Sequence, residues 1–203
     1  MSQYLCVKKH SVKAIVLFGA PGSGKGTQAT RTSEEYDIPH VSTGEMFREA
    51  IERGTELGRE VEPILRAGEL VPDELTVALI RERLAQPDAR PGFVLDGFPR
   101  NISQAEALDA MLSGIGRHLD AVLHFALPDE TATERLLGRA RAEGRTDDTP
   151  EVIARRLAIY HEQTEPLVEY YRARDLLVPL HAERSIDAVF AEIQRALELV
   201  AAR

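Results

Sequence analysis

Residues 19 to 27 read Gly19-Ala20-Pro21-Gly22-Ser23-Gly24-Lys25-Gly26-Thr27. An apolar run rich in β-branched residues, Ala14 to Phe18, precedes them, and residues 27–36, which lack Pro and Gly, follow. This order predicts a strand, a glycine loop and a helix. In such a loop the main-chain N–H groups turn inward around phosphate oxygens, and a lysine reaches the outer phosphates as a mobile charge. The stretch therefore predicts binding of a nucleotide polyphosphate.

The residue after Lys25 distinguishes this loop from the general phosphate-binding pattern. That pattern places Ser or Thr directly after the lysine to hold a metal ion, whereas here Gly26 intervenes and Thr27 comes one place later. Metal binding is therefore expected to depend on phosphates, water and another carboxylate. The simpler interpretation, a glycine turn that only joins a strand to a helix, is disfavoured because the glycines, the lysine and the flanking elements all agree.

The composition of the whole chain limits the classes of protein to consider. A length of 203 residues suffices for one full core, so a single domain is expected. The formal net charge of -8 and a pI of about 5.3 argue against non-specific nucleic-acid binding. Cys6 is the only cysteine, which excludes an intrachain disulfide and a cysteine-rich zinc site. Since no apolar run is long enough to cross a membrane, we expect a soluble cytoplasmic protein without a membrane partner.

Further strand candidates recur along the chain, at residues 38–41, 91–95, 121–126 and 176–180. Helical segments lie between them, and this alternation implies a parallel sheet with right-handed crossovers. The prediction is an α/β fold of three layers, in which helices flank a five-stranded parallel sheet. Residues 54–71 differ, because glycines at 54, 58 and 68 predict short helices in a small lobe with a thin core.

Several polar residues are expected at helix starts. Ser42 and Glu45 have the spacing of a capping box, and Asp73 and Ser185 are the expected caps of helices over residues 74–85 and 186–200. Thr43 and Arg48 remain near the first of these starts, where they could hold a phosphate or a base edge.

A second stretch with chemical potential follows the strand at residues 91–95 and reads Asp96-Gly97-Phe98-Pro99-Arg100. Ligands of open parallel sheets bind beyond the carboxyl ends of the strands, where this pentapeptide falls. Asp96 could hold Mg²⁺ through water, and Arg100 could bind a phosphate through both arms of its guanidinium. The alternative is that Asp96 caps a turn and Arg100 pairs with a surface acid. Gln104 could read a base edge or be solvated.

A third informative region runs from Arg135 to Arg156. Arg135 and Arg139 are one helical turn apart and share a face, and Gly138 to Gly144 is expected to interrupt the helix. Several cations would be needed to neutralise the phosphates of a dry site, and Asp147 and Asp148 could orient them. Arg141 and Arg155 are the expected solvated members of the group, because most charge runs are solvated faces. His40 and His124 are expected to be structural rather than catalytic.

These motifs together resemble the adenylate kinase family in their order and separation, from Val12 to the C-terminus. The resemblance implies reversible transfer of the terminal phosphoryl group of Mg-ATP to AMP, giving two ADP. It implies an ATP site that includes Gly22, Ser23, Gly24, Lys25, Gly26, Thr27, Arg135 and Arg139. The AMP site it implies includes Thr43, Arg48, Val71, Gly97, Arg100, Gln104, Arg145 and Arg156. The implied catalytic set is Lys25, Arg100, Arg139, Arg145 and Arg156, with Asp147 and Asp148 as supports and Asp96 near Mg²⁺.

The resemblance also implies a division of residues 1–203 into parts. An arm at residues 1–12 precedes a core of residues 13–41, 72–137 and 149–203, from which an AMP-binding lobe, residues 42–71, and a short lid, residues 138–148, project. A lid of this length cannot carry the zinc found in some long lids. Three features depart from the family pattern: Glu45 in place of the commoner Asp, Ala182 in place of a glycine near the ATP adenine, and the arm itself.

Two other functions compete with this interpretation. A UMP/CMP kinase shares the fold; Thr43 argues against it, although Glu45 and Asn101 favour it. A GTPase-type switch is excluded more firmly, because Asn101 is the only asparagine and is not followed by lysine. The expected mechanism needs no general base, since the acceptor phosphate is largely ionised at neutral pH. By resemblance, we expect a monomer whose partners are ATP, AMP and ADP.

Overall fold

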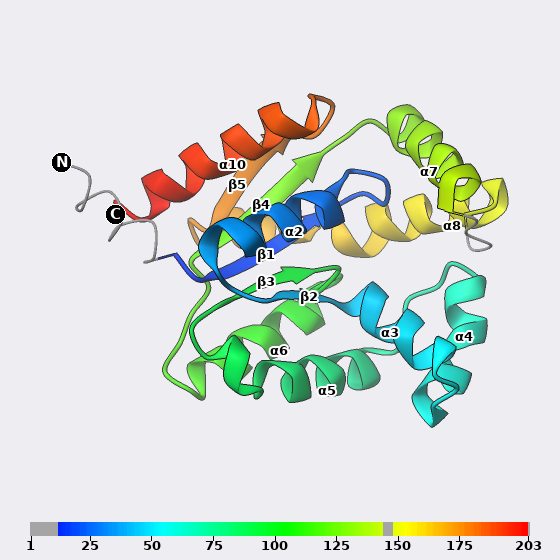
Figure 1. The fold of residues 1–203 in the computed structure, drawn as a ribbon, viewed down its shortest axis with the longest axis horizontal. Coiled ribbons are helices and arrows are strands. Elements are labelled where there is room, and N and C mark those ends of the chain that lie inside the picture. The colour runs from blue at the N-terminus through cyan, green and yellow to red at the C-terminus, as the bar shows by residue number, and fades with distance from the viewer. Residues whose placement is uncertain (1–11, 144–147, 203) are drawn as a thin grey trace.

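The computed structural model describes residues 12–143 and 148–202, and a five-stranded, all-parallel sheet forms the centre of this part (Figure 1). Its strands are β1 (Ala14–Gly19), β2 (His40–Ser42), β3 (Phe93–Asp96), β4 (Ala121–Ala126) and β5 (Leu177–His181). The strand order is β2-β3-β1-β4-β5. The chain builds the sheet to one side of β1 first and then to the other, which leaves a crevice at the carboxyl end of β1. The predicted α/β fold is confirmed.

Helices cover both faces of the sheet. Successive side chains of β1 point to opposite faces, so each face carries apolar side chains that the helices bury. Ile15 and Leu17 pack into a core with α2 (Lys25–Tyr36) and α10 (Ile186–Val200). Val16 and Phe18 pack on the opposite face with three other helices: α5 (Asp73–Leu84), α6 (Ile102–Ser113) and α9 (Leu167–Arg172). These are the three predicted layers; in Figure 1, α10 lies above the sheet, α2 crosses in the view beside β1, and α5 and α6 lie below.

The helix starts agree with the sequence where the capping signal is local. Ser42 caps α3 (Thr43–Glu52) by accepting from the N–H of Glu45, and Ser185 caps α10 by accepting from that of Ala188. The expectation for Asp73 is wrong. The N-cap of α5 is Pro72, without a side-chain cap, and Asp73 is the first helical residue. Its carboxylate accepts instead from side chains of residues near the start of α6.

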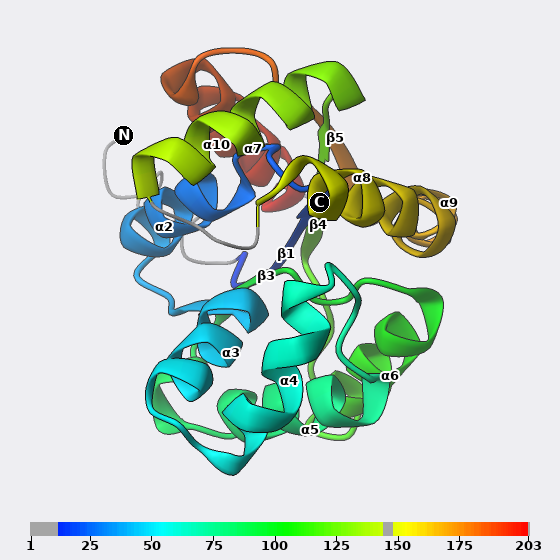
Figure 2. The same cartoon turned by 90° about the vertical axis from the view of Figure 1, so that its right-hand side faces the viewer.

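The lobe expected at residues 42–71 contains α3 and α4 (Glu56–Arg66). Phe47, Val61 and Val71 form its small core. Gly58 lies inside α4 and does not end a helix, contrary to the expectation. A Cβ there would overlap the main-chain carbonyl of Ala50, so the glycine allows α3 and α4 to cross closely. Helices α3 and α4 lie together at one end of the molecule in Figures 1 and 2.

Two further helices lie opposite this lobe. Helix α7 (Asp129–Glu143) continues through Gly138, so the expected interruption at that residue is wrong. Helix α8 (Pro150–Ile159) passes into a π-helical turn, Tyr160–Thr164, before α9. An apolar cluster that includes Ala20 and Leu136 joins α7 and α8 to the glycine loop. In Figure 2, α7 and α8 lie above α3 and α4.

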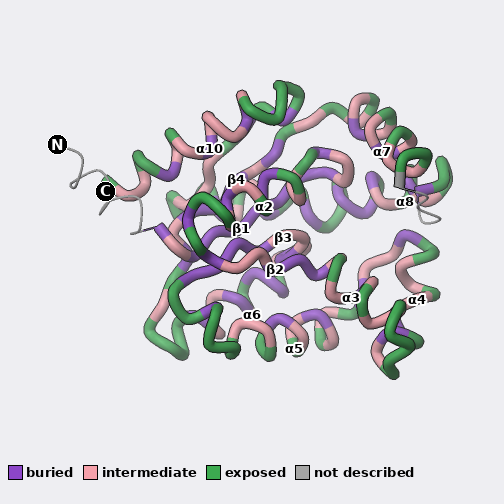
Figure 3. Tube along the Cα trace, in the orientation of Figure 1, coloured by how far each residue is buried: buried purple, intermediate pink, exposed green. Residues whose placement is uncertain are grey.

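Burial follows the layers. Strands β1 to β4 are mainly buried, whereas the edge strand β5 and the outer sides of α4, α5 and α10 are more exposed (Figure 3). A 3-10 turn, Pro87–Ala89, precedes β3. Within the described ranges, none of the helices combines the length and apolar character needed to cross a membrane.

Candidate functional site

A cavity of about 800 Å³ opens at the carboxyl ends of the strands. The glycine loop forms its centre, α3 and α4 contribute residues on one side, and α7 and α8 contribute residues on the other. The end of the molecule that faces the viewer in Figure 2 carries these elements. Many of the predicted site residues line it: Gly22, Gly24, Lys25, Gly26, Thr27, Arg48, Asp96, Gly97, Arg100, Arg135, Arg139 and Arg156.

The glycine loop curls around the ammonium group of Lys25. Lys25 Nζ donates to the carbonyls of Gly19 and Ala20, both at 2.8 Å, and to Ser23 Oγ at 3.1 Å. Gly22 has a φ of 82°, and a Cβ there would come within 2.7 Å of the Ala132 carbonyl, so no larger residue fits the curve. Desolvation lowers the pKa of Lys25 to about 8, assisted by the nearby positive charges of Arg100 and Arg139.

Asp96, at the end of β3, carries a carboxylate that stays charged inside this site. Desolvation raises the pKa of Asp96, but the imidazole of His40 and the charge of Lys25 outweigh it, so the pKa is lowered overall. His40 Nε2 lies 3.5 Å from Asp96 Oδ2, and both side chains are 13% exposed. His40 is therefore packed beside a candidate functional residue, a placement that its position in the sequence did not reveal.

On the β3 side of the loop, the carbonyl of Gly97 organises two polar side chains. It accepts from Thr43 Oγ1 at 3.0 Å and from Arg100 Nε at 2.8 Å. Thr164, from the π-helical turn, donates its hydroxyl to the carbonyl of Arg100 at 2.7 Å. These bonds fix Arg100 at the cavity wall, near the guanidinium of Arg48, which packs against Gly44.

On the α7 and α8 side, Asp148 gathers two arginines. Its fully buried carboxylate accepts from Arg139 Nε at 2.9 Å and Nη2 at 3.0 Å, and from Arg156 Nη1 at 2.8 Å. One helical turn before Arg139, Arg135 donates to the carbonyl of Ala182 at 2.9 Å. Helix α7 thus presents both arginines to the cavity, as their spacing predicted.

Some of the predicted residues lie behind the cavity lining or outside the described ranges. Ser23, Thr43, Val71 and Gln104 are buried. Gln104 is 1% exposed and bonds to Arg100 and Asp73. Arg145 and Asp147 lie outside the described residues, so their predicted roles stay predictions. Arg155, expected to be solvated, is exposed but pairs with Glu69 of the lobe at 2.8 Å.

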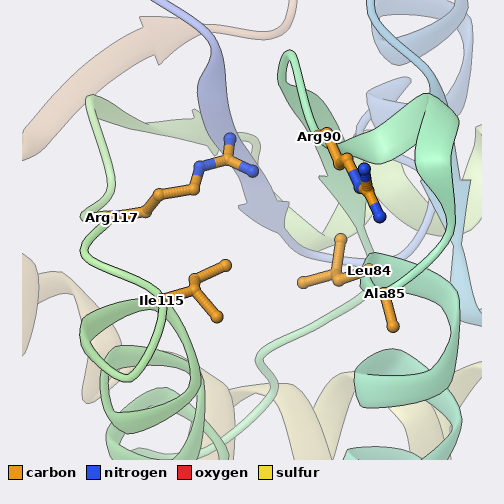
Figure 4. Close-up of a pocket in the computed structure, with 5 residues that line it drawn as sticks. All are labelled: Leu84, Ala85, Arg90, Ile115 and Arg117. Atoms are coloured by element: carbon orange, nitrogen blue, oxygen red, sulfur yellow. The ribbon is translucent and has the colours of Figure 1, made fainter.

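A second, smaller cavity of about 340 Å³ lies away from the glycine loop, between the ends of α5 and α6 (Figure 4). Leu84, Ala85, Arg90, Ile115 and Arg117 line it. The guanidinium of Arg117 lies over the ring of Phe93 and donates to the carbonyl of Ala89, so protein groups already hold this cation. The cavity brings together none of the predicted site residues.

The side chains near the cavity suit a metal ion that is also bound by substrate phosphates better than a metal ion bound by protein groups alone. Across residues 12–143 and 148–202, no three His, Cys, Asp or Glu side chains gather as a possible metal cluster. Mg²⁺ typically takes one or two protein carboxylates and completes its shell with water and substrate phosphates. The charged carboxylate of Asp96, beside the phosphate-binding loop, is consistent with this mode of Mg²⁺ binding.

The parallel sheet, the glycine loop around a lysine and the arginines on either side of it define a P-loop nucleotide-binding protein. The family model described as adenylate kinase matches residues 17–176. This chain therefore belongs to the adenylate kinase family.

Individual relatives agree with this assignment. The adenylate kinase of Moorella thermoacetica is 48% identical over 210 residues, which cover 90% of this chain and 97% of the relative. That of Thermobifida fusca is 48% identical over 184 residues, covering 91% of this chain and 97% of the relative. That of Oceanobacillus iheyensis is 43% identical over 211 residues, covering 91% and 98%. The alignments with the Moorella and Oceanobacillus relatives are longer than that with the Thermobifida relative but cover a similar share of this chain. Those two relatives therefore carry residues without a counterpart here.

Proposed function

We propose that this chain transfers the terminal phosphoryl group of Mg-ATP to AMP, reversibly giving two ADP. The observation that carries the proposal is the arrangement of one cavity around Lys25, with Arg48 and Arg100 on one side and Arg135, Arg139 and Arg156 on the other. A cavity of about 800 Å³ with cations on both sides of the phosphate loop suits two nucleotides placed with their phosphates facing each other.

In this proposal the donor lies over the glycine loop and α7. The loop N–H groups from Gly22 to Thr27 and the ammonium of Lys25 bind the phosphates of ATP. Arg135, which the Ala182 carbonyl holds in place, stacks on the adenine. Arg139 reaches the transferred phosphoryl group.

The acceptor lies on the β3 side. Arg48, Arg100 and Arg156 neutralise the phosphate of AMP, while Thr43, Val71, Gly97 and Gln104 contact its nucleoside. Arg145, together with Asp147, belongs to the same proposal through the family resemblance. The AMP phosphate is already largely ionised at neutral pH, so no side chain has to remove a proton.

Catalysis then comes from alignment and charge neutralisation. Mg²⁺, held by phosphates and through water by Asp96, would supply further positive charge to the phosphates. Asp148 fixes Arg139 and Arg156 at a common point before substrates arrive, so little reorganisation is needed when charge develops on the transferred group.

Water competes with AMP as acceptor, so the site must close before transfer. We propose that residues 42–71 and 138–148, of which 144–147 lie outside the described ranges, are the lobes that move over the core, expected at residues 13–41, 72–137 and 149–203. The additional residues of the Moorella and Oceanobacillus relatives support a short lid here, since a longer lid would account for the difference in length. Rapid-quench kinetics test slow reopening: a burst of product supports it, and its absence contradicts it.

We also propose that the chain acts as a cytoplasmic monomer that binds neither nucleic acid nor membrane. The net charge of -8 and the single cysteine support this setting. Light scattering coupled to size exclusion tests the oligomeric state; a mass near 22.5 kDa is expected, and twice that mass contradicts the monomer.

The decisive experiment measures initial rates of ADP formation with Mg-ATP and, in parallel, AMP, UMP, CMP, GMP or no acceptor. A strong preference for AMP is expected. Preference for UMP or CMP would keep the mechanism but overturn the acceptor, and slow hydrolysis without acceptor preference would overturn the transferase.

A further inference from the structure

Asp73 connects the start of α5 to the start of α6, two helices that pack side by side below the sheet (Figures 1 and 2). Its Oδ1 accepts from Gln104 Nε2 at 2.7 Å and from Asn101 Nδ2 at 2.9 Å. Asn101 Oδ1 in turn accepts from the Gln104 main-chain N–H at 2.8 Å. The three side chains therefore form one network around the carboxamide of Gln104.

This network permits only one orientation of the Gln104 carboxamide. Gln104 Oε1 accepts from the main-chain N–H of Arg100 at 2.8 Å. A carboxylate can only accept, and a main-chain N–H can only donate. Turning the amide over would set oxygen against the Asp73 carboxylate and NH₂ against the Arg100 N–H. Because Gln104 is only 1% exposed, water could not compensate for either mismatch.

The fixed orientation determines which hydrogen-bonding groups Gln104 retains for a ligand. After these two bonds, the amide keeps one N–H and one acceptor position. The pairing edge of adenine offers an amino donor at N6 and an acceptor at N1, whereas that of hypoxanthine offers an acceptor at O6 and a donor at N1. Base choice by a glutamine therefore depends on which way its amide faces, and a turned amide suits the 6-oxo purine.

We infer that Asp73 is a positioning residue that makes Gln104 select a 6-amino purine acceptor over a 6-oxo purine. The inference rests on the proposed function, in which Gln104 contacts the base of AMP. Asparagine in place of Asp73 can accept or donate, so it removes one of the two constraints on the Gln104 amide and leaves the Arg100 N–H as the other.

Steady-state kinetics of Asp73→Asn with AMP and with IMP as acceptor test this role. The ratio of kcat/KM for AMP to that for IMP is expected to fall about twofold to tenfold, because one of the two hydrogen bonds that impose the orientation of the amide is no longer required. Glu74→Gln is the matched control, since it removes the same charge from the next, exposed residue of the same helical turn. Its ratio is expected to stay at the wild-type value.

A double-mutant cycle separates positioning from general damage. In a Gln104→Ala background, Asp73→Asn is expected to leave the remaining AMP-to-IMP ratio unchanged, because no amide is left to orient. If Asp73→Asn does not fold, as judged by its thermal melt, Asp73→Ser replaces it, since a hydroxyl also accepts or donates.

The outcomes distinguish a failure of the proposed function from a failure of the role assigned to Asp73. A wild-type protein without preference for AMP overturns the proposed function. A wild-type preference for AMP that folded Asp73 variants retain overturns the role of Asp73 and leaves the proposed function in place. An equal fall with Glu74→Gln attributes the effect to helix charge and also overturns the inference.

Discussion

At the scale of single residues, the most informative group is Asp148 with its two arginines. The fully buried Asp148 carboxylate pairs with both Arg139 and Arg156. Both guanidinium groups are therefore held in place by a negatively charged partner. Truncating one arginine leaves the carboxylate paired with the other, which limits the structural damage. Functional loss and loss of folding can therefore be separated at this site.

Arg139→Ala is predicted to fold and to lose turnover on the order of 10³-fold, by comparison with arginine fingers. Measurements of kcat and of the thermal melt check this prediction. Arg141→Ala, an exposed arginine on the same helix, serves as the control and should keep its rate. Turnover close to wild type in folded Arg139→Ala would refute the role.

The lowered pKa of Lys25 predicts a pH dependence. Because the free protein holds this lysine at a pKa of about 8, its positive charge is present below that pH and lost above it. The value of kcat/KM for Mg-ATP reports the free enzyme, so it should fall about tenfold per pH unit above about pH 8. The stability effect has the opposite sign: the unfolded state, with a pKa near 10.5, binds more protons between these values, so this group favours folding as pH rises.

Lys25→Arg provides the control for this profile, because arginine keeps its charge throughout the range. Its overall activity should be lower, since the guanidinium does not fit the carbonyls of Gly19 and Ala20 in the same way. A wild-type profile that stays flat to about pH 9.5 would contradict the assignment of the titrating group.

At the scale of elements, the close crossing of α3 and α4 depends on Gly58. Gly58→Ala is predicted to push the helices apart and to cost about 1–3 kcal/mol of local stability. Gly138→Ala is the comparison: no atom lies within 4 Å of a Cβ at this helical site, so it should stabilise by about 0.5–1 kcal/mol. Hydrogen exchange of α3 and α4, together with the thermal melts, checks both.

These two glycines also show where sequence reasoning about elements succeeds and fails. Ser42 and Ser185 were predictable as caps because their partners lie three residues away. Gly58 and Gly138 were misread as breaks, since glycine looks the same in sequence whether it ends a helix or permits a close crossing. Asp73 was misread because its partners are 28 and 31 residues distant.

At the scale of the whole molecule, the parallel sheet and its layers followed from strand and helix alternation alone. The cavity position followed as well, since the glycine loop and Asp96 both end strands of that sheet. The hydrogen bond that supports Arg100 could not be predicted, because its donor Thr164 lies 64 residues away in a π-helical turn that no local sequence pattern indicates. The assigned roles of the site residues remain predictions that kinetics must test.

One contact bridges the lobe and α8. Glu69 pairs with Arg155 at 2.8 Å, beside Gly68, where a Cβ would lie 3.0 Å from Val152 Cγ1. The Glu69→Arg variant replaces the attraction between the lobe and α8 with repulsion, so the KM for AMP is predicted to rise at low salt. The expected rise is only about twofold to threefold, because exposed ion pairs are weak and are screened by salt. Combining it with Arg155→Glu should restore the KM, and about 0.5 M salt should abolish the difference. An unchanged KM at low salt would exclude a role for the pair in AMP binding.

In the proposed function, the strand order divides most of the groups that bind the two nucleotides between the two halves of the sheet. Thr43 follows β2, Asp96 ends β3, and Gly97 and Arg100 come after it, whereas Ala182, which holds Arg135, follows β5 beyond β4. The glycine loop after β1 serves both halves, and Arg156, on α8 after β4, is proposed to reach across to the acceptor phosphate. Acceptor preference can therefore evolve by substitutions on one half while donor handling stays unchanged, and we expect the loop to be the part that tolerates the least sequence drift.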